Sequence, residues 1–184
     1  MKLKQLIIEN FKGLKSIKVN FNTEGVTEII GENGAGKTSI QDALYWLFFD
    51  KNSAGKSDFN VRPLESGVVI KGLSVSVTAE VLHNDNTLHL YQKDQEENIV
   101  KGKLKGYKNK YWIDEVPKKQ SEFIAEFSEI IDENTFKLLT DLYYFNHKMH
   151  WTDRRNTLLE LAGENIKKPN ESEFTELFKE KERI

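Results

Sequence analysis

The sequence predicts an α/β fold in which a mixed sheet, an antiparallel β subdomain and a helical segment share 184 residues. Three observations predict it. Apolar and polar residues alternate over much of the chain before Pro117, which is typical of half-buried strands. Apolar residues three and four apart after Lys37 predict an amphipathic helix. The same helical spacing dominates after Pro117.

Composition excludes several classes of protein. Hydrophobic residues make up 38% of the chain and charged residues 30%, which suits a soluble domain with its own core. The formal net charge of -2 gives no overall attraction to nucleic acid or membrane, so DNA binding would need a local patch. The absence of cysteine rules out disulfides and thiolate metal sites. The apolar run at the N-terminus is too short for a signal peptide or a membrane span, so we expect a cytoplasmic protein with no membrane partner.

The first elements in chain order are three strands and a helix. Strands are predicted at residues 2–9, 16–21 and 26–30, and the third leads directly into a glycine-rich turn. The helix after Lys37 should bury one face, formed by Ile40, Ala43, Leu44, Leu47 and Phe48. Residues 49–67 contain glycine, proline and many polar side chains, which predicts a loop.

Residues 72–113 are predicted to form β hairpins. The first strand should point Leu73, Val75, Val77, Ala79 and Val81 inward, and residues 87–92 should be its partner. A lysine-rich ribbon then extends the sheet with Lys101, Lys103, Lys105, Lys108 and Lys110, interleaved with Tyr107, Tyr111 and Trp112. Such a ribbon could follow a DNA backbone, or its lysines could protect an edge strand from aggregation.

The segment from 117 to 163 is predicted to be helical. A first helix capped by Ser121 should bury Phe123, Phe127 and Ile130, and a second should bury Phe136, Leu139 and Leu142. A third, capped by Thr152 and stopped by Gly163, should bury Leu158, Leu159 and Ala162. Residues 166–184 form a charged helical pattern with Phe174, Leu177 and Phe178 and no stop signal.

A phosphate-binding loop of the P-loop NTPase type lies at residues 31–38. The pattern G-x-x-x-x-G-K-[ST] is matched by Gly31, Gly36, Lys37 and Thr38, with a predicted strand before it and a helix after it. Backbone N–H groups and the helix N-terminus would hold phosphates, and Lys37 would reach the β and γ phosphates of ATP. Thr38 would hold Mg²⁺ through its hydroxyl, and Ser39 could bond the α-phosphate.

A second Gly-Lys-Ser run, at residues 55–57, is interpreted as a loop. Asp50 stands where the first glycine of a phosphate loop should be, and a polar segment follows instead of an apolar helix.

The parts needed for hydrolysis are not evident. A Walker B element would be an apolar strand ending in an acid that supports Mg²⁺. Residues 128–133, "SEIIDE", come nearest, but Glu129 interrupts the apolar run and a helix fits better. The sequence therefore predicts a nucleotide-binding part of an ATPase.

The segments "MKLKQLIIENFKGLKSIKVNFN" and "VTEIIGENGAGKTSIQDAL" resemble the N-terminal lobe of SMC/RecF/SbcC-type ABC ATPases, closest to SbcC-like AAA proteins of bacteria and phage. The resemblance implies an N-terminal lobe at 1–165, with a helical Q-loop-like region at 117–163, and the start of a coiled-coil arm at 166–184. It also implies a C-terminal ATPase lobe, in cis or in trans, that supplies the signature motif, Walker B and the catalytic Glu. Two heads would dimerise around ATP to act in DNA double-strand-break repair or DNA processing, with DNA and a nuclease as partners.

The same resemblance assigns individual residues. Asn33, Gly34, Ala35, Gly36, Lys37, Thr38 and Ser39 match the phosphate loop, and Lys12 and Gly13 match the loop that approaches the adenosine end. "YFNHKMHWTDRRNTLLELAG" resembles the Q-loop region, where the usual Gln that touches Mg²⁺ and the attacking water is absent. Asn146 is its expected substitute, as a catalytic and metal-binding residue, with His147 next.

Four basic residues are candidates for contacts with DNA or a partner head. Arg154 and Arg155 could contact DNA, brace the Q-loop or form surface salt bridges, and Lys56 and Arg62 lie in the loop after the first helix. His147 and His150 have helical spacing, but without a third ligand a structural role is favoured over a metal site.

Two other functions stay open. The chain could be a self-contained P-loop kinase or small-molecule NTPase, although it lacks Walker B and an acceptor-binding lid. It could instead be a non-catalytic nucleotide-binding module. On the preferred interpretation, this chain alone binds ATP weakly and hydrolyses little or none.

Overall fold

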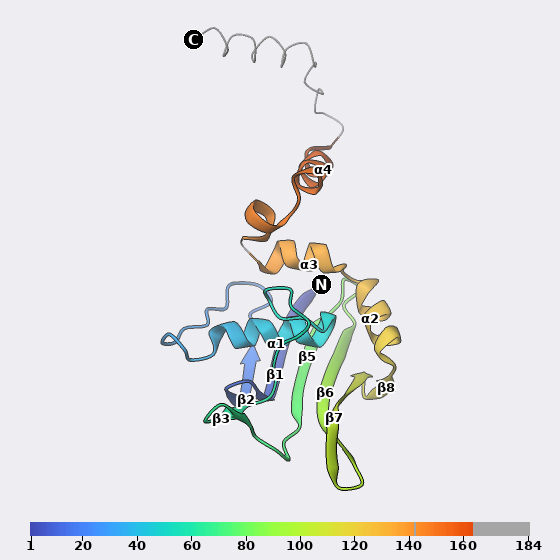
Figure 1. Cartoon of the computed structure of the whole chain (residues 1–184). Coiled ribbons are helices and arrows are strands. Elements are labelled where there is room, and N and C mark those ends of the chain that lie inside the picture. The colour runs from blue at the N-terminus through green and yellow to red at the C-terminus, as the bar shows by residue number, and fades with distance from the viewer. Residues whose placement is uncertain (142, 164–184) are drawn as a thin grey trace, which may run out of the picture. The chain divides into compact units, whose positions relative to one another are not determined.

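The computed structural model describes residues 1–141 and 143–163, which fall into two compact units. The first unit spans Met1–Phe136 and the second begins at Lys137. The elements, most of which are labelled in Figure 1, are β1 (Lys2–Phe11), β2 (Leu14–Asn20), α1 (Lys37–Phe49), β3 (Leu64–Glu65), β4 (Val68–Val69), β5 (Val75–Leu82), β6 (Leu88–Val100), β7 (Lys103–Ile113), β8 (Val116–Lys118), α2 (Gln120–Ser128), α3 (Glu133–Thr140), the π-helix η1 (Tyr144–Lys148) and α4 (Trp151–Ala162).

A six-stranded sheet in the order β2-β1-β5-β6-β7-β8 forms the first unit, and every neighbouring pair is antiparallel. The predicted α/β class is confirmed, but the prediction of a mixed sheet is wrong for the described residues, because the strands placed around the phosphate loop and those of the hairpins join in one antiparallel sheet. Alternate residues of each strand share one face, so Leu6 and Ile8 of β1 lie beside the inward residues of β5 and are fully buried. Val75, Val77, Ala79 and Val81 are buried as predicted, whereas Leu73 lies before β5 and is half-buried.

Helix α1 covers the apolar face of the sheet and carries an aromatic cluster. Its predicted face is confirmed, and Tyr45, Trp46 and Phe49 widen it. Phe48 stacks on Phe127 of α2 with ring centroids 3.7 Å apart and an angle of 7° between the planes. The rings of Tyr91 and Phe136 pack against Phe48 in edge-to-face geometry and complete the cluster. One core therefore joins α1, α2, β6 and the start of α3.

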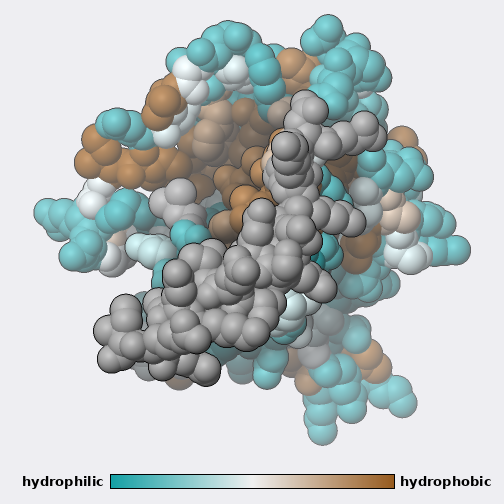
Figure 2. Space-filling view, turned by 90° about the horizontal axis from the view of Figure 1, so that it is seen from above, coloured by the Kyte–Doolittle hydropathy of each residue, from teal (hydrophilic) through white to brown (hydrophobic). Residues whose placement is uncertain are grey.

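The predicted strand at 26–30 does not form. These residues pair with no strand in the described part of the chain, and Val26 and Ile30 are 84% and 86% exposed. A strand needs a neighbour for its N–H and C=O groups, and its apolar sequence alone does not supply one. Exposed apolar side chains also interrupt the hydrophilic surface elsewhere, as the brown patches of Figure 2 show for one face.

One detail is wrong in each of the first two helices predicted after Pro117. Helix α2 begins at Gln120, and the Glu122 carboxylate accepts a hydrogen bond from the Lys119 N–H at 3.1 Å, so Ser121 is not the cap. Phe123, Phe127 and Phe136 are buried as predicted, and Ile130 packs on the core after α2 has ended, but Leu139 is 74% exposed. Leu142 lies outside the described residues.

The second unit contains η1 and α4. Helix α4 begins at Trp151 with His150 as its N-cap, two residues before the predicted Thr152. It ends at Ala162, and Gly163 has φ 67°, which confirms the predicted stop. The face predicted to be buried is exposed in the described residues, at Leu158, Leu159 and Ala162. The arm predicted at 166–184 lies outside the described residues.

No helix in the described ranges has the length and hydropathy needed to cross a membrane.

A buried lysine ties the end of α1 to the sheet. Lys93 of β6 is 0% exposed, and its Nζ donates to the Trp46 carbonyl at 2.7 Å and forms an ion pair with Asp50, the C-cap of α1. Asp50 also accepts hydrogen bonds from the Tyr111 hydroxyl at 3.1 Å and from Gln120 at 2.7 Å. A cation at a helix C-terminus is favourable, and here it also joins strand to helix.

This lysine should make the stability of the chain pH-dependent. Burial lowers the pKa of Lys93 to about 8, although the Asp50 charge opposes that shift. Between pH 8 and the ordinary lysine value the unfolded chain holds a proton that the folded chain has released, so the free energy of unfolding rises with pH. We expect a rise of at most about 1.4 kcal/mol per pH unit from about pH 8 to 9.5, measured by urea unfolding. Lys93→Met should flatten that slope, and an unchanged slope would contradict the assignment.

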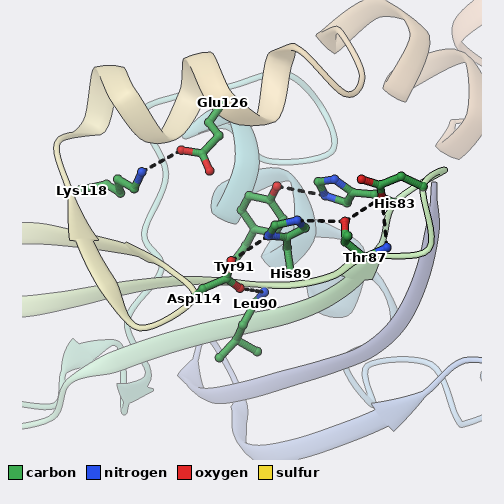
Figure 3. A network of polar contacts seen from close by, with 9 residues as sticks. His83, Thr87, His89, Leu90, Tyr91, Asp114, Lys118 and Glu126 are labelled. Atoms are coloured by element: carbon green, nitrogen blue, oxygen red, sulfur yellow. Dashed lines mark hydrogen bonds and ion pairs between the residues drawn. The ribbon is translucent and has the colours of Figure 1, made fainter.

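A polar network at the ends of β5, β6 and β7 supplies hydrogen-bond partners for His83 and His89 (Figure 3). His89 lies between Asp114, 2.7 Å from Nδ1, and Thr87, 3.1 Å from Nε2. His83 lies 3.2 Å from the Tyr91 hydroxyl, and burial, followed by the charge of His89, lowers its pKa. These partners occupy both ring nitrogens of His89 and Nε2 of His83, and no group of three or more His, Cys, Asp or Glu that could hold a metal ion is found among the described residues. The network therefore fixes two turns of the sheet.

Candidate nucleotide-binding site

The glycine-rich loop at 31–36 runs straight into α1. Gly34 and Gly36 have φ values of 87° and 99°, a conformation that favours glycine. Helix α1 starts at Lys37, and it has neither a side-chain cap nor an acidic residue in its first turn. Its N-terminal N–H groups and positive dipole end are thus left for an anion, which fits a phosphate.

Lys37 folds back over this loop. Its Nζ donates to the Gly31 carbonyl at 2.7 Å and to the Glu32 carbonyl at 2.8 Å, and the side chain is exposed. Thr38 and Ser39 follow in the first turn of α1, where Thr38 is exposed and Ser39 half-buried. The structure therefore brings the ammonium, the two hydroxyls and the glycine turn together, as the motif predicts.

Gly36 is the most constrained of these positions. A Cβ built there would lie 2.5 Å from Cδ2 of Leu14, so the phosphate loop packs directly against the start of β2. Gly36→Ala should lower the free energy of unfolding by about 1–2 kcal/mol through its left-handed backbone and should weaken ATP binding by displacing the turn. Gly102→Ala is the matched control, because φ there is 73° and nothing lies within 4 Å. Urea unfolding would measure the free energy of unfolding of each variant, and calorimetric titration would measure its affinity for ATP. An unaltered ATP affinity in Gly36→Ala would contradict the expectation.

Lys12 and Gly13 form the turn between β1 and β2, next to the loop after α1. The Lys12 N–H donates to the Val61 carbonyl at 2.7 Å. A cavity of about 320 Å³ opens beside this turn, lined by Lys12, Gly13, Asn60, Arg62 and Leu64. A second cavity of about 250 Å³ shares the turn and includes Leu14, which contacts the phosphate loop at Gly36. The expected adenosine-side residues thus lie beside a hollow that adjoins the phosphate loop.

Asp42 organises this region, and sequence reasoning missed it. It is buried on α1 and accepts hydrogen bonds from the Ser53 N–H at 2.8 Å, from Ser53 Oγ at 2.6 Å and from Lys12 Nζ. Burial alone would raise its pKa, but the bonds from Lys12 and Ser53 outweigh it and leave the pKa of Asp42 below its ordinary value. An acid within an otherwise apolar helix face, directly before Ala43, was the available signal.

The structure separates the two basic residues of the 51–63 loop. Lys56 is exposed in this loop, and its contact with DNA or a partner head stays a prediction. Arg62 is 1% exposed, which contradicts the expectation of a DNA contact. Its guanidinium donates to the Leu73 carbonyl, lies 3.7 Å from Glu97 and sits 4.5 Å from the centre of the Tyr107 ring. Its Nε has no hydrogen-bond partner in the part of the chain that the structure describes.

The Q-loop-like residues belong to the second unit. Asn146 lies in η1, and its carbonyl accepts a hydrogen bond from Nη1 of Arg154 at 2.9 Å. This contact supports the bracing role considered for the arginine pair, while Arg155 is exposed. Both arginines line a cavity of about 480 Å³ within this unit, together with Phe145, Trp151, Leu158 and Leu159. The catalytic and metal-binding role of Asn146 stays a prediction.

Comparisons with known proteins agree with the resemblance in the sequence. The chain is 36% identical to the chromosome partition protein Smc of Halobacteriovorax marinus over 94 residues, covering 50% of this chain and 8% of that protein. It is 37% identical to the DNA replication and repair protein RecF of Bacteroides fragilis over 73 residues, covering 39% of this chain and 20% of RecF. A DNA double-strand break repair Rad50 ATPase of Thermococcus kodakarensis is 50% identical over 50 residues, covering 25% of this chain and 6% of Rad50.

The chain thus spans a small fraction of the length of these relatives. A solved structure of the recombination mediator protein RecF with ATP superposes with a TM-score of 0.47 at 21% identity, over 65% of this chain and 28% of that one.

The family profile described as AAA ATPase domain matches residues 1–184, the whole chain. This chain therefore belongs to the AAA ATPase domain family.

Proposed function

We propose that this chain is the ATP-binding N-terminal lobe of an SMC-like ATPase head that acts in DNA double-strand-break repair or DNA processing. The observation that carries the proposal is the glycine turn at 31–36, which opens onto the uncapped N-terminus of α1 with Lys37 folded over it. The names of the relatives, Smc, RecF and Rad50, support the DNA-related role.

Each part of the site has a task in binding. The N–H groups at the start of α1 and the Lys37 ammonium would hold the phosphates, and Lys37 would exchange its bonds to the Gly31 and Glu32 carbonyls for phosphate oxygens. The cavity beside Lys12 and Gly13 would take the adenosine end. Asp42 would keep the Lys12 ammonium and the 51–63 loop in place beside that cavity.

Mg²⁺ fits the hydroxyl and amide oxygens that the motif offers. Thr38 would hold it through its exposed hydroxyl, and Asn146 is the proposed second contact from the Q-loop-like region. When bound, the ion supplies charge neutralisation at the β and γ phosphates.

Hydrolysis is proposed to need residues from another lobe. The acids nearest to a Walker B pattern have structural tasks: Asp132 accepts the Thr135 N–H at 3.0 Å at the start of α3, and Glu133 forms an ion pair with Lys51 at 2.8 Å. Residues 26–30 form an exposed apolar segment directly before the phosphate loop. A strand of a C-terminal ATPase lobe, in cis or in trans, would pair with it, complete the sheet and bring the catalytic acid. A second head, DNA and a nuclease are the further proposed partners.

ATP turnover tests this proposal. The purified chain should bind ATP weakly and turn over little, and activity should appear when a C-terminal lobe from the same gene is co-expressed. Lys37→Ala should abolish that activity. Steady turnover by the chain alone, lost in Lys37→Ala, would mean that a catalytic acid lies within it, with Asp132 or Glu133 to be replaced first, and would overturn the proposal.

A further inference from the structure

The hairpin of β6 and β7 continues beyond the sheet that carries it. Strand β5 pairs with β6 only as far as Gln95, whereas β6 and β7 pair with each other up to Val100 and Lys103. We call residues 96–108 the hairpin arm. Figure 1 shows the arm running past the end of β5, and Lys101 and Gly102, both with positive φ, make its tight turn.

The outer part of the arm carries positive charge that no acid among the described residues neutralises. Lys101, Lys103 and Lys105 are exposed, residues 98–106 contain no acid, and these lysines form no salt bridge with any residue that the structure describes. At the base of the arm the situation differs, because Lys110 forms an ion pair with Glu96 at 2.6 Å. A chain with a net charge of -2 thus concentrates cations at one projecting tip.

Apolar side chains share this tip. Ile99, Val100, Leu104 and Tyr107 are 59%, 44%, 43% and 43% exposed. Lysines alone would be explained as protection of an edge strand, since charges there discourage pairing with other chains. Exposed apolar residues beside them work against that protection, so edge protection does not account for the arm.

The base of the arm is held firmly. Glu97 accepts a hydrogen bond from the Gly72 N–H at 2.9 Å and lies 3.7 Å from the buried Arg62 guanidinium, which also sits under the Tyr107 ring. Arg62 lines the cavity beside Lys12 and Gly13. The arm is therefore a braced projection whose foot adjoins the proposed adenosine side.

We propose that the hairpin arm contacts double-stranded DNA, with Lys101, Lys103 and Lys105 on the phosphates and the neighbouring apolar side chains against the sugars of the minor groove. This inference rests on the proposed function, since it names the surface that meets the DNA. The dense negative charge of the duplex is complementary to the positive charge of the tip. Apolar side chains are a common means of contact in the minor groove.

The test is fluorescence anisotropy of a labelled duplex titrated with the full chain at several salt concentrations. The variant Lys101→Gln, Lys103→Gln, Lys105→Gln should bind at least tenfold more weakly at low salt. The slope of log affinity against log salt should fall by up to about 2.7, at about 0.9 for each lost phosphate contact. The control replaces Lys4, Lys18 and Lys119, which are exposed elsewhere in the first unit, and thus makes the same change in net charge. The control should keep most of the affinity.

Several outcomes would overturn the inference. If the control weakens binding as much as the tip variant, the attraction is general. If the tip variant keeps DNA binding but aggregates, the lysines protect an edge. If it keeps DNA binding but loses binding to phosphatidylserine vesicles, the arm is a membrane contact. ATP binding by the tip variant should stay unchanged, and failure of the unmodified chain to bind ATP would count against the proposed function instead.

Discussion

Lys37→Ala is expected to reduce the affinity for ATP by about 10- to 100-fold, because a hydrogen bond to a charged group contributes about 1.5–3 kcal/mol. Lys37 is the cation that lies over the phosphate loop, within reach of the Gly31 and Glu32 carbonyls. Calorimetric titration of the purified chain with ATP in the presence of Mg²⁺ would measure the change.

Lys56→Ala is the matched control for that experiment. Lys56 also stands in a Gly-Lys-Ser run, but its loop is hydrogen-bonded to itself through Asn52 and is followed by no helix. It should bind ATP like the unmodified chain. Since the Lys37 side chain is exposed, its removal should leave the urea midpoint nearly unchanged. Equal ATP affinity in Lys37→Ala and Lys56→Ala would show that the phosphate loop is not the binding site.

Phe48→Ala is expected to lower the free energy of unfolding by about 3–5 kcal/mol, the usual cost of a buried aromatic truncated to alanine. Phe48 is 1% exposed, stacks on Phe127 and contacts the edges of Tyr91 and Phe136, so the cavity would open where α1, α2 and β6 meet. Urea unfolding followed by far-ultraviolet circular dichroism would measure it.

Val68→Ala gives the reference for this prediction. Val68 is 67% exposed on β4, and its truncation should change the free energy of unfolding by no more than about 0.5 kcal/mol. A loss below about 1 kcal/mol in Phe48→Ala would mean that the aromatic cluster is not the centre of the core.

Much of the site could be predicted because its determinants are local. The turn at 31–36 follows from glycines that adopt positive φ, and the helix that begins at Lys37 follows from apolar spacing and carries the lysine and the hydroxyls. Gly163 ends α4 for the same kind of local reason. Residues within one turn or one helical face set these features, so the sequence contains them directly.

The tertiary structure decided what depends on distant neighbours. Arg62 looks like an ordinary surface charge in the sequence, and for Asp42 the sequence shows only that an acid lies on an apolar helix face. Neither pattern names the partners, which are Ser53 and Lys12 for Asp42 and Glu97 and Leu73 for Arg62. The partners of these two side chains come from segments that are distant in the sequence. The spacing of apolar and polar residues does not show which distant segments meet.

By itself, the sequence determined the α/β class, the phosphate loop and the inward faces of α1 and β5, because period and glycine placement fix them locally. Only the tertiary structure decided that residues 26–30 have no strand partner among the described residues, that Leu139 faces outward and that Arg62 is buried. The physical reason is common to all three. Strand pairing and burial depend on which other segment packs against a residue, and the residue's own apolar or charged character does not decide that.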